Sequence, residues 1–151
     1  MGVVNISIFY LLCLLMQKIY INLPVSDLSK ATAFYEALGL TKNEQFSNTD
    51  ASAMVYDDTL SVMLLTHDFC KGFLPAHKTI ANSHETCQVL NALQLDSKEQ
   101  VDIFFDKAIA AGGKATIPAY DHGFMYGRDF EDLDGHIREV FWMDVSQMPG
   151  K

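Results

Sequence analysis

A single carboxylate stands among apolar side chains in the last strand that the sequence predicts, residues 136–143. Alternate side chains of a strand share a face, and those that share the face of Glu139 are Ile137, Phe141 and Met143. Burial among hydrocarbon raises the pKa of a carboxyl group and prepares it for proton transfer. Glu139 is therefore a candidate general base or ligand acceptor; the alternative is a structural acid paired with Arg128 or Tyr20.

Three further polar side chains are candidates for orienting a ligand. Tyr20 and Asn22 share the polar face of the first predicted strand, and a phenol or carboxamide can hydrogen-bond a carbonyl or hydroxyl group. Arg128, in the strand before that of Glu139, can offer a guanidinium fork to a carboxylate or phosphate. Two alternatives stay open: Asn22 satisfies a strand end, or Arg128 is a surface or glutamate-paired arginine.

The cysteines, histidines and acidic run lack the spacing of a disulfide framework or a metal site. Three cysteines, an odd number without close pairs, are expected to be reduced and mostly buried: Cys13, Cys70 and Cys87. His136 follows a turn and is expected to pack against it. The other histidines fall in loops and are expected in solvent: His67, His77, His84 and His122. The aspartate-rich segment 129–135 does not fit the pattern of a calcium-binding loop and predicts a hairpin turn.

Hydrophobic periodicity predicts the elements that position these residues, beginning with a strand over residues 18–24. Ser26 or Asp27 can cap the helix that follows, residues 28–38. The apolar stripe of this helix consists of Leu28, Ala31, Phe34, Tyr35 and Leu38. Three short strands are then expected, near residues 41–46, 51–56 and 60–66. A connection with one short helix is expected over about residues 67–86.

The second half of the chain repeats this order. The elements expected are a strand near residues 89–95, a helix over 98–111 and strands at 124–130 and 136–143. A shift of 70 residues, the difference between positions 25 and 95, places Val25 on Leu95 and Phe34 on Phe104. The sequence therefore predicts two βαβββ units. A unit that cannot bury its sheet face alone must pair with its copy, which predicts one body of the α+β class.

Composition sets limits on the partners. The chain of 151 residues is 49% hydrophobic, with 11 Lys+Arg against 19 Asp+Glu and a net charge of −8. This acidic balance, without a basic cluster, argues against a nucleic-acid partner. The apolar residues 3–16 are too short to span a bilayer. Residues 1–15 are expected to be an extension upstream of a natural start at Met16, and the alternative is a membrane-surface anchor.

Several short motifs occur in a characteristic order between residues 16 and 144. They are Val25-Ser26-Asp27-Leu28, Phe34-Tyr35, Leu38-Gly39-Leu40, Gly127-Arg128-Asp129-Phe130, Asp132-Leu133-Asp134-Gly135-His136 and Glu139. In this order the sequence resembles the vicinal oxygen chelate superfamily, which contains glyoxalase I, bleomycin and fosfomycin resistance proteins and extradiol dioxygenases. The resemblance implies one domain of paired βαβββ modules, about residues 16–66 and 87–144, with a tail over 145–151. It implies that the strands curl into a cup around a small-molecule site, often in a dimer.

The resemblance also suggests where a metal would be held. Metal-dependent members place four ligands inside the cup, and the matching positions here are Tyr20, Leu64, Leu90 and Glu139. Only Glu139 ligates a divalent cation in the ordinary way, and a catalytic metal needs several converging donors. We therefore expect no cofactor, and expect Leu64 and Leu90 to line the ligand site; a divalent metal at Glu139 is the alternative.

Three functions are consistent with these residues and this resemblance. The first is a metal-independent lyase or isomerase in which Glu139 transfers a proton while Tyr20, Asn22 and Arg128 orient a small molecule. The second is a binding protein that sequesters an aromatic or cationic compound, as the resemblance to bleomycin resistance proteins implies. The third is a metal-dependent lactoylglutathione lyase or dioxygenase. For each we expect a cytoplasmic homodimer with no membrane partner.

Overall fold

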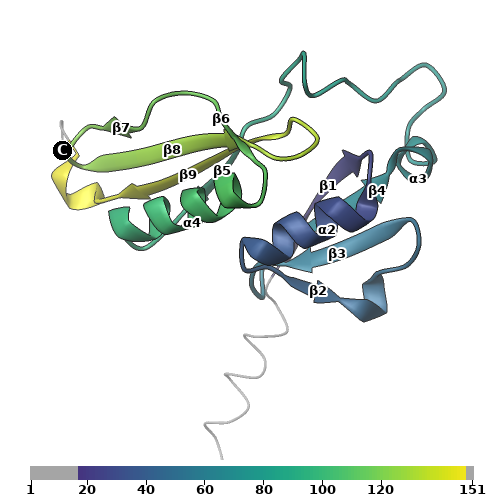
Figure 1. Ribbon diagram of the computed structural model, residues 1–151, viewed down its shortest axis with the longest axis horizontal. Helices are drawn as coiled ribbons and strands as arrows, with labels where there is room; N and C mark the ends of the chain where they lie inside the picture. Colours follow the sequence, from purple (N-terminus) through teal and green to yellow (C-terminus); the bar gives the residue numbers. More distant parts are fainter. Residues whose placement is uncertain (1–16, 149–151) are drawn as a thin grey trace, which may run out of the picture.

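The computed structural model describes residues 17–148, which form two units with the same order of elements. The units lie side by side, and residues 72–90 of the connection pass along one side of both (Figure 1). The expectations for residues 1–15 and for Cys13 lie outside the described residues. Between residues 17 and 148, no helix is long and apolar enough to cross a membrane.

The first unit is a four-stranded sheet covered by one helix. Its elements are β1 (Ile19–Val25), α2 (Leu28–Ala37), β2 (Thr41–Asn43), β3 (Ala51–Val55) and β4 (Leu60–Thr66), with strand order β1-β4-β3-β2. Strand β1 runs parallel to β4, and the other pairs are antiparallel. The strand predicted to reach residue 46 ends at Asn43, because the Asn43 side chain accepts a hydrogen bond from the Gln45 amide and begins a 3-10 turn, Glu44–Phe46.

The second unit follows the same plan after the short helix α3 (His67–Lys71). Its elements are β5 (Asn91–Gln94), α4 (Lys98–Ala110), β6 (Lys114–Ala115), β7 (Tyr120–Asp121), β8 (Met125–Glu131) and β9 (Ile137–Met143), followed by a 3-10 turn, Val145–Gln147. The sheet has the order β5-β9-β8-β6, and β7 also pairs with β8. Strands β6 and β7 were not predicted, because two residues are too few to show a period of two.

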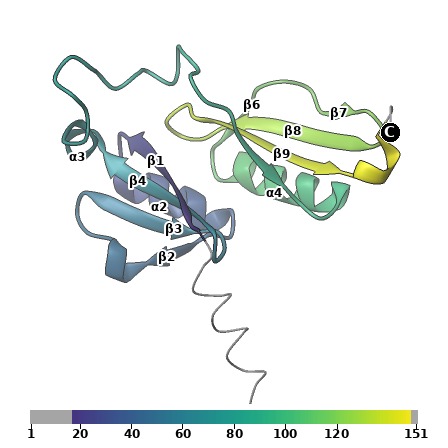
Figure 2. The same cartoon turned by 180° about the vertical axis from the view of Figure 1, so that it is seen from behind.

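One hydrophobic core joins the helix-covered sides of the two sheets. The Phe130 ring of β8 is fully buried and lies 6.4 Å from Phe34 of α2 and 6.3 Å from Phe105 of α4, measured between ring centroids. Helices α2 and α4 are in contact at this junction (Figure 2). We call the side of each sheet that meets its helix the helix-facing side, and the opposite side the far side.

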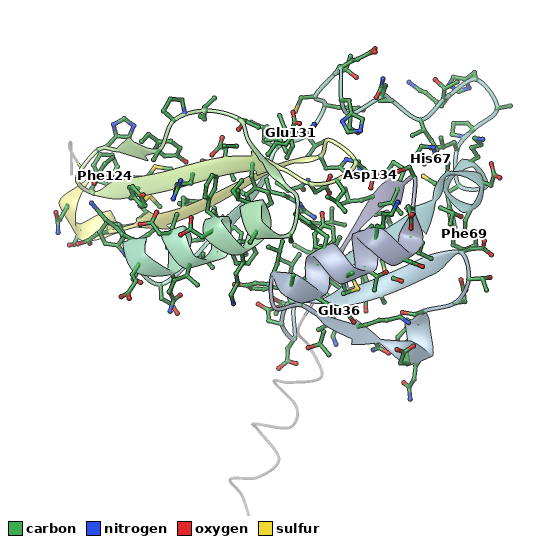
Figure 3. The ribbon with its side chains drawn as sticks, in the orientation of Figure 1. Glu36, His67, Phe69, Phe124, Glu131 and Asp134 are labelled. Atoms are coloured by element: carbon green, nitrogen blue, oxygen red, sulfur yellow. The ribbon has the colours of Figure 1, made fainter. Side chains whose placement is uncertain are left out.

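The turn between β8 and β9 attaches the second unit to the first. Asp134 accepts hydrogen bonds from the backbone amide and the hydroxyl of Ser26, both at 2.7 Å. The Nε2 atom of His136 lies 2.8 Å from the Pro24 carbonyl oxygen. Figure 3 shows Asp134 directed toward the first unit. The predicted hairpin turn is thus present, and His136 packs beside it as expected.

A buried hydrogen-bond relay, formed by Asp132, Tyr35 and Arg138, joins the units beneath this turn. The Tyr35 hydroxyl donates to Asp132 Oδ2 at 2.7 Å and accepts from Arg138 Nε at 3.2 Å and Nη2 at 2.9 Å. Burial raises the pKa of Tyr35, so its hydroxyl keeps the proton that it donates. The relay explains why an arginine stands on the helix-facing side of β9, where an apolar residue would be ordinary.

Replacing Tyr35 by Phe should therefore destabilise the fold markedly. The change leaves Arg138 and Asp132 buried without their shared partner, and we expect a loss of about 2–4 kcal/mol in the free energy of unfolding, measured by urea denaturation. Tyr126→Phe is the matched control, because the Tyr126 hydroxyl donates to Asp102 at the partly exposed edge of α4 and its loss should cost about 1 kcal/mol or less. Equal losses for the two variants would contradict a relay that joins the units.

Candidate functional site

Two carboxylates lie side by side on the far side of the second sheet. Asp129 of β8 is directly opposite Glu139 of β9 in the antiparallel register. Side chains of directly opposite residues share a face and lie close together. The Tyr120 hydroxyl, from β7, donates to Glu139 Oε1 at 2.5 Å. Tyr120, Asp129 and Glu139 together form what we call the acid cluster.

The position of Tyr120 depends on Gly127. Tyr120 is opposite Gly127 in the pairing of β7 with β8, and its ring lies across the glycine. A Cβ atom at position 127 would overlap the Tyr120 hydroxyl. The glycine therefore allows the phenol to cross the strand and reach Glu139 on the next one.

Burial and charge together disfavour the ionised form of Asp129. Burial, and secondly the charge of Glu139, raise the pKa of Asp129 above its usual value. The Asp129 Oδ1 atom is buried and has no hydrogen-bond partner within residues 17–148. Burial and the bond to Glu139 also raise the pKa of Tyr120, which keeps the phenol protonated as a donor.

Glu139 lies where the alternation of β9 predicts it, half-buried on the far side with Ile137 and Phe141. Its partner was not predicted. The sequence suggested Arg128 or Tyr20, whereas the structure supplies the Tyr120 phenol. The described residues contain no Lys, Arg or His nitrogen within 4.0 Å of the two carboxylates of the acid cluster.

Arg128, expected at the ligand site, lies on the opposite side of the sheet from Glu139. Arg128 is opposite Val140 in the register, on the helix-facing side, whereas Glu139 is on the far side. Its Nη1 atom lies 3.1 Å from Asp102 and 3.6 Å from Asp106, and its guanidinium lies 3.6 Å from the centre of the Phe105 ring. Arg128 thus belongs to the packing of α4 against the sheet.

Leu64, also expected to line the ligand site, lies in the hydrophobic core. Leu64 is fully buried on the helix-facing side, opposite Leu23. The far side of β4 carries its neighbours Met63 and Leu65 instead. A continuously apolar strand gives no alternation from which to choose a face, and the position carried over from the resemblance falls one residue away from the far side.

Tyr20 and Asn22 lie together on the far side of the first sheet, as predicted. Tyr20 is opposite Ser61 and is 50% exposed, and Asn22 is opposite Met63. They are therefore on a different sheet from Glu139. Leu90 precedes β5 and is 57% exposed.

The surroundings of the cysteines and histidines are also defined. Cys70 and Cys87 are free thiols, but Cys87 is exposed, so the expectation of mostly buried cysteines fails for it. It lies in the connection, where the backbone crosses the surface without covering elements. His67, His77, His84 and His122 are exposed, as predicted.

Asp129 and Tyr120 are the site residues that the sequence interpretation missed. The signal for Asp129 was present: the tight turn after Glu131 fixes the hairpin register, and this register places Asp129 opposite Glu139. Tyr120 offered no such signal, because it lies in a two-residue strand outside the predicted elements.

Comparison with known proteins identifies the family. Residues 19–140 match the Glyoxalase/Bleomycin resistance protein/Dioxygenase superfamily, and the chain belongs to it. Among curated proteins, none matches the sequence.

Several solved structures share the fold. A hypothetical protein from S. aureus is 26% identical, with a TM-score of 0.70 over 85% of this chain and 94% of that one. A glyoxalase/bleomycin resistance protein/dioxygenase family enzyme from Burkholderia phytofirmans is 17% identical, with a TM-score of 0.66 over 83% of this chain and 97% of that one. The fosfomycin resistance protein FosX from Listeria monocytogenes is 20% identical, with a TM-score of 0.61 over 85% of this chain and 93% of that one.

The residues present do not fit the metal site of the metal-dependent members. Within residues 17–148, no three His, Cys, Asp or Glu side chains converge in a way that could hold a metal ion. Of the four matching positions, Leu64 is in the core and Leu90 and Tyr20 offer no ordinary ligand, which leaves Glu139 alone.

Asp129→Asn should stabilise the protein at neutral pH. A carboxyl group whose pKa is raised by folding stabilises the fold below its unfolded pKa, and this stabilisation is lost as the pH rises through the folded pKa. At pH 7 the parent therefore carries the cost of a buried charge beside Glu139, which the variant lacks. We expect the advantage of the variant in urea midpoint to shrink as the pH falls toward 3.8, the usual value for aspartate.

The baseline for this measurement is Asp58→Asn, since Asp58 is exposed in the turn between β3 and β4. That change also removes one aspartate charge, but it should not give the same gain at pH 7. A destabilised Asp129→Asn variant at neutral pH would contradict the acid cluster as described.

Proposed function

We propose that this member of the superfamily binds a small organic molecule and acts as a metal-independent lyase or isomerase, with Glu139 as the proton-transfer group. The observation that supports this most directly is the acid cluster: a half-buried carboxylate held by a phenol and placed opposite a second carboxyl group. A carboxylate of this kind, on a rigid strand and away from cations, is suited to general base chemistry.

The proposed step removes a proton from a carbon next to a carbonyl group. Glu139 accepts the proton, the C–H electron pair forms an enolate, and the Tyr120 hydrogen bond keeps the carboxylate oriented. For a hydroxyketone, the hydroxyl proton passes to the former carbonyl oxygen and Glu139 returns its proton to the former carbonyl carbon, which completes an isomerisation. In a lyase reaction the leaving group departs from the β carbon with its electron pair and takes the proton from Glu139. Neither route changes the oxidation state of the protein. Asp129, whose pKa is raised, is a second group that can hold the proton removed from the substrate.

Tyr20 and Asn22 would orient the carbonyl or hydroxyl group of the substrate from the other sheet. The proposal includes a homodimer for this reason. Twofold symmetry can place the far side of the first sheet of one copy against the far side of the second sheet of the other, which forms two equal sites at once. The exposed phenol of Tyr20 would become buried in such a dimer. We further propose a reducing, cytoplasmic location, which suits the free thiols of Cys70 and Cys87.

A second candidate function is sequestration of a cationic compound without chemistry. Two adjacent carboxylates without a cation within 4.0 Å, among the described residues, favour it. A ligand ammonium or guanidinium group would supply the missing positive charge beside the half-buried Glu139 carboxylate. FosX is a fosfomycin resistance protein, and its likeness to this chain supports the fold alone.

Glu139→Gln separates the two candidates. In the parent protein we expect exchange of carbon-bound hydrogen for deuterium, followed by NMR in deuterium oxide, on at least one member of a panel of dicarbonyl compounds, hydroxyketones and epoxide-bearing acids. The variant should lose the exchange by a factor of about 100 or more, because an amide cannot accept the proton, while its affinity for the same compound is retained.

The matched control is Glu131→Gln, the same chemical change on the same far side of the sheet, beside the turn (Figure 3). Its exchange rate should equal that of the parent. Exchange that persists in Glu139→Gln would eliminate Glu139 as the base. A parent that binds a cationic compound but exchanges no hydrogen in the panel would favour sequestration.

The proposed homodimer predicts a shift in molecular mass when its interface receives a charge. Tyr20→Glu would place a carboxylate at the expected junction of the far sides, and we expect sedimentation equilibrium to show conversion from dimer to monomer. The control is Ile103→Glu, which alters a residue of α4 that is 48% exposed and away from both far sides. A parent protein that is monomeric at high micromolar concentration would contradict the dimer.

A further inference from the structure

A cavity of about 300 Å³ lies between the two units, on the helix-facing sides of the sheets. Its walls are mainly apolar and come from both units: Ile21, Leu38, Leu60 and Val62 from the first, and Leu93 and Phe104 from the second. This cavity has Glu139 in common with the acid cluster but is not lined by Tyr120 or Asp129. Glu139 contributes to the wall, but its carboxylate is bonded to Tyr120 on the far side. The volume is at the lower end of the range of small-molecule sites, about 300–1,000 Å³.

Arg138 brings a positive charge to this apolar cavity. Arg138 is 9% exposed and borders the cavity together with Tyr35. Two of its nitrogens, Nε and Nη2, donate to the Tyr35 hydroxyl. In residues 17–148 no carboxylate oxygen lies within 4.0 Å of the guanidinium, and Nη1 has no hydrogen-bond partner.

The charge of Arg138 is therefore compensated only indirectly. The nearest acid in the relay is Asp132, which Arg138 reaches through the neutral Tyr35 hydroxyl. A buried guanidinium normally has a carboxylate or phosphate as its direct partner, because removing the cation from water is costly. Arg128, on the same side of the same sheet, shows the ordinary arrangement with Asp102 and Asp106.

We propose that the cavity between the units binds a small apolar monocarboxylate, whose carboxylate group pairs with Arg138 while its hydrocarbon part contacts the walls from both units. The free Nη1 edge offers donors for the carboxylate oxygens, and charge-assisted bonds of this kind are strong in an apolar environment. A cation would be repelled by Arg138, and an uncharged hydrocarbon would leave the guanidinium without a partner. The proposal does not rest on the proposed chemistry at Glu139, although Glu139 lines the cavity.

The test compares decanoate with 1-decanol, which have the same number of carbons but differ in charge. Isothermal titration calorimetry on the parent should show decanoate binding at least ten times more tightly than decanol, with one site per chain. Arg138→Gln should remove this preference and leave the two affinities within a factor of about three. Arg128→Gln, the matched control on the neighbouring strand, should keep the parent preference.

A second variant keeps the test decisive where Arg138→Gln folds poorly. Leu60→Trp retains Arg138 but fills the cavity with an indole, and it should abolish binding of both decanoate and decanol while the fold, followed by circular dichroism, is retained. Equal affinities for decanoate and decanol in the parent would overturn the proposal. Decanoate binding that survives in Leu60→Trp would also overturn it, because the ligand would then bind elsewhere.

Discussion

The buried contact between Arg138, Tyr35 and Asp132 determines how the two units are arranged. Each sheet is covered on one side by a single helix, and the apolar surface of such layers must be buried against another element. The relay brings a residue of α2 between two residues of the second unit, so the helix-facing sides meet and share the core around Phe130. Its polar groups require one geometry, whereas the apolar contacts around it would accept several.

The same arrangement separates positive from negative charge across the second sheet. Arg128 and Arg138 lie on the helix-facing side, and Asp129 and Glu139 lie on the far side. Consecutive residues of a strand point to opposite sides, so the sheet itself prevents these arginines from neutralising these acids. Burial is the main cause of the raised pKa of Asp129, and the separation adds to it because the charge of Glu139 acts on Asp129 without a neighbouring cation.

Much of the fold could be predicted from the sequence, because both helices and the long strands carry clear periodicity. The candidate site was harder to predict from the sequence. The face of Glu139 follows from alternation along one strand, but that of Leu64 does not, because its strand is apolar on both sides. The position of the Arg128 side chain depends on two aspartates of α4. The position of Tyr120 depends on Gly127 and on a strand of two residues. Residues that act through such tertiary partners leave no local pattern to detect.

The two units of the repeat differ in the contacts that their corresponding turns make. In the first unit the Asp57 carboxylate accepts bonds from Thr59 and Leu60, and the turn serves only its own hairpin. In the second, Asp132 closes the turn with one oxygen and reaches Tyr35 with the other. The second unit thus contributes both the attachment and the acid cluster, whereas the far side of the first unit offers uncharged hydrogen-bonding groups on β1. A duplicated fold can support chemistry in this way without duplicating the chemical groups, because only the pairing of the units must be symmetric.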